Sequence, residues 1–296
     1  MTKESMAAVP SASGLPAAGP AVTRQFLLSA LKLPVQPLDF GADLDGDGRV
    51  DNRLGALISA LRGSGLNLQA TVDQAVRDGS ALVLFTLMAE QSDLTVEQRA
   101  DVAIVRALGT GEADPLATRV TLSGRLSGGR FTSESPEPGS DVITWSLELP
   151  LGPGLPAQLP VQWPGIEFTI DPTGTRLVGR LTGSLADSSA PTSLVPSLAA
   201  AFTLFISTSP DSRIARSIKA LFDTGGCVNP DGTTAAAGNG RIDPCELTQS
   251  PLIRSLLAPD IQLRDAAGHY HPVPSGPQRD SLSLGFGITA TTPNPT

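Results

Sequence analysis

The sequence is poor in lysine and in aromatic residues, and each shortage narrows the range of functions. Lysine occurs only at Lys3, Lys32 and Lys219, so arginine carries most of the positive charge. The net charge of −8 disfavours nucleic acid or an anionic membrane as a partner. Aromatic residues make up 4% of the chain, which leaves few rings for stacking against sugars or bases. We therefore expect a globular protein that does not bind nucleic acid.

Long apolar runs are also absent. No stretch approaches the roughly 20 residues that a membrane-spanning helix needs, so we expect no membrane span. The N-terminus lacks the charged and then apolar pattern of a signal peptide. Residues 1–20 are rich in Ala, Pro, Ser and Gly, which predicts a flexible lead-in. Two interpretations follow: the protein is extracellular or at a cell surface, with its leader absent from this chain, or it is cytoplasmic.

Sequence signatures of catalysis are lacking as well. Neither a Gly-x-Ser-x-Gly elbow nor a phosphate-binding Gly-Lys-Ser/Thr loop occurs. A Ser-His-Asp triad would have to use His269 or His271, the only histidines, and no spacing points to one. The acidic residues Glu134, Glu137 and Asp141 lie in a stretch rich in Pro, Ser and Gly, which favours a solvated loop over a glycosidase pair. We therefore expect a non-enzymatic protein.

What the chain does contain is a regular series of aspartates near residue 45. Positions 1, 3, 5 and 9 of this loop carry Asp43, Asp45, Asp47 and Asp51, and position 6 carries Gly46. Alternate side chains of such a loop converge on one point, and the glycine permits the sharp turn around a hard cation. Four carboxylates so close together repel one another without a counter-ion. The pattern favours a calcium loop over the alternative, an acidic solvated turn.

A partial copy of this pattern lies far along the chain. Asn239, Asp243 and Glu246 fall at positions 5, 9 and 12 of the second loop. Alanines stand at its positions 1 and 3, so the front-half ligands must come from an expanded loop. The candidates for that role are Asp231, Asn229 and Asp223. The spacing does not choose among them, and Asp231 enters the predicted ligand set.

Both loops resemble those of the EF-hand superfamily, including its dockerin-like and thrombospondin type 3-like variants, over roughly a tenth of the chain. The resemblance implies two Ca²⁺ sites. The ligands implied for the first are Asp43, Asp45, Asp47, Asp51 and the carbonyl of Arg49. Those implied for the second are Asn239, Asp243, Glu246 and the carbonyl of Arg241, with Asp231 added as above.

The two loops differ from the family pattern in complementary ways. The first carries Leu54 at position 12, where an EF-hand has a bidentate carboxylate, and the second lacks the front half. In paired EF-hands the residues at position 8 form a short antiparallel bridge, and here these are Val50 and Ile242. The resemblance thus implies one helical lobe built from both ends of the chain. The alternative is two isolated loops at different corners of one domain.

Two cysteines, Cys227 and Cys245, bracket the second loop. A disulfide between them would close the expanded loop and stabilise the protein by about 3 kcal/mol in the chain-entropy model. Such a bond suits an extracellular setting. The alternatives are two free buried thiols, or a zinc site with His269 and His271, for which the cysteine spacing is poor. We expect the disulfide.

Hydrophobic periodicity predicts an α+β fold: an antiparallel β-sandwich or jelly-roll-like sheet with a helical EF-hand-like lobe. Helices are expected at 22–32, 52–61, 68–77, 193–206, 211–222 and 245–257, and strands at 81–88, 119–126, 141–149, 166–170, 176–185 and 281–289. After the lead-in, the chain divides into a helical segment with the first calcium loop (21–80), a β-rich segment (81–190), a helical segment with the second loop (191–258) and C-terminal strands that complete the sheet (259–296).

These features favour a calcium-stabilised extracellular or cell-surface protein with a structural or binding role, whose partner would be an unknown protein or glycan. One alternative is a calcium-dependent carbohydrate-binding module or adhesin, which would expose Trp163 beside a groove. Another is a hydrolase with a cleft that joins His269 or His271 to a serine and a carboxylate. Amino-acid usage (Ala, Gly, Leu, Pro and Arg) suggests a GC-rich bacterial source, and the layout resembles surface proteins of such bacteria.

Overall fold

The structure, a computed structural model, describes residues 21–151, 156–187 and 189–293. The predicted lead-in at 1–20 lies outside these residues. The helices are α1 (Arg53–Gly63), α2 (Leu68–Arg77), α3 (Ser189–Thr208), α4 (Arg213–Phe222), α5 (Pro244–Gln249) and α6 (Pro251–Leu256). The strands are β1 (Val22–Lys32), β2 (Leu82–Ala89), β3 (Gln98–Ala107), β4 (Val120–Ser127), β5 (Arg130–Ser133), β6 (Thr144–Leu149), β7 (Ala157–Ile170), β8 (Arg176–Ala186) and β9 (Ser281–Thr291).

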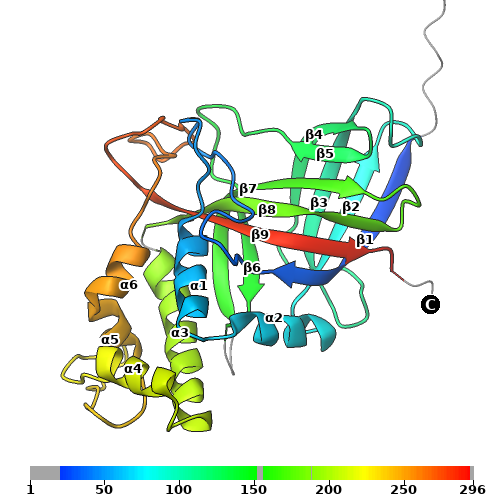
Figure 1. Ribbon diagram of the computed structural model, residues 1–296. Helices are drawn as coiled ribbons and strands as arrows, with labels where there is room; N and C mark the ends of the chain where they lie inside the picture. Colours follow the sequence, from blue (N-terminus) through cyan, green and yellow to red (C-terminus); the bar gives the residue numbers. More distant parts are fainter. Residues whose placement is uncertain (1–20, 152–155, 188, 294–296) are drawn as a thin grey trace, which may run out of the picture.

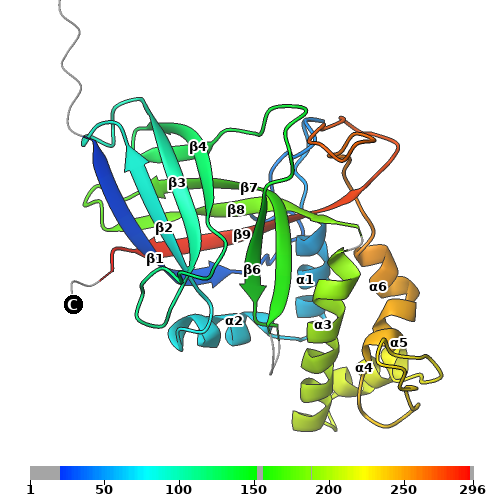
Figure 2. The same cartoon turned by 180° about the vertical axis from the view of Figure 1, so that it is seen from behind.

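Eight of the strands form a closed antiparallel barrel (Figures 1 and 2). The ring runs β5-β4-β3-β2-β1-β9-β8-β7 and closes where β5 pairs with β7. β7 bends at Trp163, whose φ is +45°, and its register against β8 shifts between Gln162 and Gly165. The half before the bend pairs with β6, and the half after it pairs with β5. One long strand therefore belongs to the barrel and to a hairpin beside it.

The predicted β-sandwich or jelly-roll-like sheet is wrong, because the sheet closes on itself. At the seam, Phe131 on β5 stands opposite Phe168 on β7, and their rings stack with centroids 5.2 Å apart. Glu167 on β7 pairs with Arg130 on β5 and with Arg180 on β8. Strands of a sandwich and of a barrel both bury one face, so alternation of side chains does not distinguish the two architectures.

The segment 22–32, predicted as a helix, is strand β1. Phe26 and Leu28 alternate with more exposed residues, as expected for a strand with one buried face. A register shift against β9 between Leu28 and Ala30 then moves Leu31 to a buried position. This bulge breaks the alternation and makes the apolar spacing resemble a helical period. The helix predicted at 22–32 is therefore wrong.

The predicted helices at 52–61, 68–77, 193–206 and 211–222 are confirmed, whereas the one predicted at 245–257 is divided at Pro251 into α5 and α6. The helices pack on one end and one side of the barrel. The side chain of Asn52 caps α1 by accepting the N–H of Gly55 at 2.8 Å. α1 packs on β9, α2 on β1, and α3 on β7 and β8, while α4 and α5 pack on α3. Within the described residues, none of the helices has the length and apolar character that a bilayer crossing requires.

The predicted EF-hand-like lobe is also wrong. Both views place the first loop (blue, 43–51) at one end of the molecule and the second loop (yellow, 223–246) at the other. Val50 is 45% exposed, whereas Ile242 is buried with its N–H and C=O bonded to the hydroxyl of Thr203 on α3. No β-bridge joins the two loops within the described residues. The alternative of isolated loops at different corners describes the arrangement.

The first loop lies close against β9 because the side chains on the outer face of this strand are small. Leu282, Leu284, Phe286 and Ile288 alternate with Ser283, Gly285 and Gly287 along this strand. A Cβ on Gly285 would lie 2.3 Å from the carbonyl oxygen of Phe40, so only glycine allows this segment to lie against the strand. Asn52 donates to the carbonyl of Gly285 at 3.2 Å, and the N–H of Arg53 donates to Ser283 Oγ at 2.8 Å. These contacts hold both ends of the loop at the barrel wall.

Candidate metal centre

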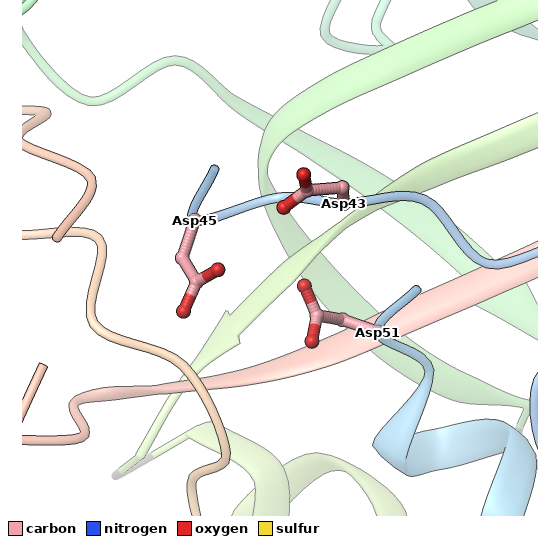
Figure 3. A group of neighbouring side chains, drawn as sticks. All are labelled: Asp43, Asp45 and Asp51. Atoms are coloured by element: carbon pink, nitrogen blue, oxygen red, sulfur yellow. The ribbon is translucent and has the colours of Figure 1, made fainter. Parts of the chain in front are cut away.

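Three aspartate side chains of the first loop point toward one another (Figure 3). Asp43, Asp45 and Asp51 each offer one carboxylate oxygen, and these oxygens all lie within 4.8 Å of one another. Asp45 is buried, Asp51 is half-buried and Asp43 is exposed. Oxygen ligands on opposite sides of a Ca²⁺ ion lie about 5 Å apart. The spacing of the three carboxylates is therefore compatible with one shared cation.

Backbone hydrogen bonds hold these side chains in place. The amides of Gly46 and Gly48, both with φ near +80°, donate to the two carboxylate oxygens of Asp43 at 2.8 and 2.9 Å. The N–H of Asp51 donates to the carbonyl of Ala42 at 2.8 Å in a β-bridge that closes the loop. The positive φ values explain the Asp-Gly-Asp-Gly run, because glycine adopts this conformation without steric cost.

Asp47, also in the predicted ligand set, lies outside this group of three, and the carbonyl of Arg49 stays a predicted ligand. The carboxylate of Asp47 accepts the N–H of Arg49 at 2.8 Å and the hydroxyl of Ser275 at 3.1 Å. Arg49 itself is exposed. Asp47 therefore connects the loop to the segment that precedes β9, and Asp43, Asp45 and Asp51 form the cluster.

The cluster has an excess of negative charge. Burial raises the pKa of Asp51 to about 6, and the nearby charges of Asp45, Asp260 and Asp47 add to the rise, while the N–H of Leu44 opposes it. Burial also raises the pKa of Asp45. Within the described residues, no lysine or arginine forms an ion pair with any carboxylate of the cluster. A cation in this position would compensate charges that the protein itself leaves uncompensated.

In the second loop, Asp223 holds the place that Asp43 holds in the first. Its two carboxylate oxygens accept the amides of Asn239 and Gly240 at 3.2 and 2.8 Å. Asn239 in turn accepts the N–H of Arg241 at 2.7 Å, as Asp47 accepts that of Arg49. Asp223 is thus a functional candidate that the predicted ligand set omitted. Its position just after the amphipathic helix α4 was the available signal.

The remaining acidic side chains of the second loop bond to the protein itself. Glu246 accepts the amides of Gly225 at 2.7 Å and Asp243 at 2.8 Å, so that it completes a capping box at the start of α5. Asp243 forms an ion pair with Arg241 at 3.1 Å. Within the described residues, these carboxylates do not gather into a group of the kind seen in the first loop.

The insertion in the second loop is held by the predicted disulfide, which the structure contains between Cys227 and Cys245. Asn229 accepts the N–H of Cys245 at 3.2 Å. Asp231 accepts the N–H and hydroxyl of Thr233 in an exposed turn, and it has no contact with Asn239 in the described bonds. The disulfide also removes the cysteines as thiolate ligands, which excludes the zinc alternative.

The aromatic side chains considered for sugar stacking are buried. Trp145 is 2%, Trp163 5% and Tyr270 6% exposed. The ring of Trp163 lies 5.3 Å from that of Tyr270 and 5.4 Å from the guanidinium of Arg264. This cluster is a small satellite core beneath the 260–280 segment, and it offers no open platform for a glycan.

The histidines do not form a triad within the described residues. His269 lies 3.8 Å from Asp141 and 3.6 Å from Asp265, at exposed positions. The hydroxyl of the neighbouring Ser140 is buried and has no hydrogen-bond partner. Among the hydrogen bonds of the described residues, none joins a serine hydroxyl to His269 or His271, as a hydrolase triad would require.

Comparison of the chain with models of known families, with curated proteins and with solved structures found no match. The likeness of the two loops to the EF-hand superfamily therefore stays a prediction from the motif.

Proposed function

We propose that the first loop binds one Ca²⁺ ion through Asp43, Asp45 and Asp51, and that this ion stabilises an extracellular or cell-surface protein with a structural or binding role. The observation that carries the proposal is the convergence of three carboxylates with no cationic side chain among them. An ion that binds the native state and not the unfolded chain stabilises the fold by mass action.

The chemistry of the cluster favours calcium among the common metals. All three side-chain ligands are carboxylates, and hard oxygen ligands select Ca²⁺ or Mg²⁺ over zinc or copper. The loop is irregular and partly exposed, which suits the flexible coordination of Ca²⁺ better than the strict octahedron of Mg²⁺. Water molecules would complete the coordination, since position 12 carries the apolar Leu54.

The position of the loop gives the ion a structural task. Ser275 donates its hydroxyl to Asp47 at 3.1 Å and its backbone N–H to Asp45. Asn52 and Arg53 attach the other end of the loop to β9. A bound ion would therefore tie together the first loop, the segment before β9 and the barrel wall.

We propose a second, weaker calcium site at Asp223, Asn239, Asp243 and Glu246, with the carbonyl of Arg241. The repeated hydrogen-bond pattern around Asp223 and Asp43 supports it. Ion binding there requires Glu246 and Asp243 to exchange contacts with backbone amides and with Arg241, and this exchange lowers the affinity.

The disulfide supports the proposed compartment, because such bonds form and persist in oxidising environments. An extracellular setting would supply the oxidising conditions for this disulfide. It would also supply the millimolar calcium that weak calcium sites need. The partner there would be a protein or a glycan.

Thermal unfolding with Ca²⁺, with Mg²⁺ and with chelator tests the proposal. At a concentration of about one hundred times Kd, one ion stabilises by about 2.7 kcal/mol, which raises the Tm of a chain of this size by about 5 °C. Asp45→Asn should remove most of the rise. Asp141→Asn, which changes the charge equally at a 97% exposed carboxylate, should keep it. A Tm that is the same in calcium and in chelator would contradict the proposal.

A further inference from the structure

An apolar groove lies at the helical end of the molecule, between the C-terminal end of α1, α4 and α6. Its volume is about 470 Å³, within the range of about 300–1,000 Å³ that small-molecule sites occupy. Its walls are formed mainly by Leu61, Leu66, Ile214, Ile218, Leu252 and Leu256. The stacked rings of Phe202 and Phe222 line it as well. The groove thus has the size and apolar lining of a ligand site.

Two leucines at the edge of the groove are exposed to solvent. Leu221 is 58% and Leu252 52% exposed, and both line the groove. The two serine hydroxyls in the lining donate to backbone carbonyls, Ser64 to Ala60 at 2.9 Å and Ser217 to Arg213 at 3.1 Å. Among the side chains that line the groove, Arg213 is therefore the one that can bind a polar group of a ligand.

The helices that line the groove are basic, although the chain has a net charge of −8 and Asp211 and Asp223 flank α4. The helices α1, α4 and α6 contain no Asp or Glu, and their basic residues are Arg53, Arg62, Arg213, Arg216, Lys219 and Arg254. Arg213 is exposed, lines the groove and makes no ion pair in the part of the chain that the structure describes. It is also the first residue of α4, where the helix dipole attracts an anion.

We propose that this groove binds a single-chain amphiphile with an anionic headgroup, a fatty acid being the simplest. The alkyl chain lies along the leucine and isoleucine walls, and the carboxylate pairs with Arg213. A concave apolar site suits an inserted chain, whereas a second copy or a protein partner needs about 800 Å² of complementary surface per partner. The inference is independent of the proposed calcium function, because the groove shares no residue with either loop.

Calorimetric titration of the full disulfide-bonded chain with laurate and with the uncharged dodecanol tests the proposal. The wild type should bind both. Arg213→Gln should weaken laurate about tenfold, as expected for the loss of a charge-assisted pair, and leave dodecanol unchanged. Arg216→Gln is the matched control, because Arg216 lies on the same helix and does not line the groove. It should change neither affinity. Chelator should have no effect on either ligand.

Ser217→Trp should fill the groove and abolish both titrations, with Ala60→Trp as a second blocking variant should the first fail to fold. Equal laurate affinity in the wild type and in a folded blocking variant would overturn the proposal. So would laurate binding that Arg213→Gln leaves unchanged. Two other results point to other occupants and also overturn it: a dimer that the blocking variants dissociate, or binding to anionic vesicles without binding of monomeric laurate.

Discussion

Asp223 and Asp43 bind backbone amides in the same way in two loops at opposite ends of the molecule. The carboxylate of Asp43 accepts the N–H of Gly48 at 2.9 Å, and that of Asp223 accepts the N–H of Gly240 at 2.8 Å. In the first loop the acid precedes the glycine by five residues, and in the second by 17. The insertion, which contains Cys227 of the disulfide, therefore lengthens the loop without displacing its first acidic position.

Asp223→Ala should destabilise the protein by about 1–3 kcal/mol, because it leaves the amides of Asn239 and Gly240 without an acceptor in a partly buried position. Asp231→Ala removes an exposed carboxylate that serves only its own turn, and it should cost no more than about 0.5 kcal/mol. Urea unfolding of both variants measures the difference. Equal losses would show that Asp223 has no special place in the second loop.

Calcium binding should remove the pH dependence that Asp51 gives to stability above pH 4. The pKa of Asp51 is about 6 in the folded chain against 3.8 without burial, so the ion-free native state retains a proton that the unfolded state has lost. Its contribution to the unfolding free energy therefore falls as pH rises through this range. Calcium requires the ionised carboxylate, so the stabilisation by calcium should grow as pH rises through about 6.

The difference between the wild type and Asp51→Asn isolates this contribution from those of other carboxylates. In chelator, the wild type should lose stability relative to the variant as pH rises from about 4 to 7. In saturating calcium this loss should disappear, because the bound ion keeps Asp51 ionised in the native state across the whole interval. Parallel curves in both conditions would contradict the assignment of Asp51 to the metal centre.

Removal of the disulfide should destabilise the chain by about 3 kcal/mol, since the two cysteines are separated by 18 residues. The double variant Cys227→Ser and Cys245→Ser, compared with the wild type by urea unfolding, gives this value. Calcium stabilisation through the first loop should persist in the variant, because that loop lies at the other end of the molecule. If the variant also lost its stabilisation by calcium, the disulfide and the first loop would be energetically coupled. That result would contradict the separation of the two sites in the structure.

Gly285→Ala should weaken both the fold and the first loop. The new Cβ would lie 2.3 Å from the carbonyl oxygen of Phe40, a backbone atom, so the segment leading to Asp43 must move. We expect a loss of about 1–3 kcal/mol and a lower calcium affinity. Gly109→Ala, where no other atom lies within 4 Å of the new Cβ, should change stability by less than about 0.5 kcal/mol.

Several local elements could be predicted from the apolar period, although strand β3 (Gln98–Ala107) was missed. The helix after Asn52 and the two strands around Asp171–Gly174 are where the pattern placed them. The helix predicted at 22–32 was wrong because a bulge near Ala30 interrupts the alternation of buried and exposed residues. Closure of the barrel depends on β5, a strand of four residues whose partner in β7 is distant in sequence. Such long-range pairing leaves no periodic signal in a single sequence.

The candidate site was predictable to the extent that its residues are adjacent in sequence. Asp43, Asp45 and Asp51 come from one motif, and the fold brings them together. The spacing left Asp231, Asn229 and Asp223 open as front-half ligands, because the insertion hides the register of the second loop. The pairing of Val50 with Ile242 was inferred from family geometry and required the two loops to be neighbours. The helices α1, α3 and α6 lie between the two loops in both views, so the contact does not form.

Calcium titration of the chelated chain by calorimetry tests the central claim most directly. We predict saturable binding to the wild type, retention of that binding in Asp141→Asn and its loss at the tighter site in Asp45→Asn. A wild-type chain that shows no saturable heat at millimolar calcium, or an Asp45→Asn chain that binds as tightly as the wild type, would contradict a metal centre at this loop.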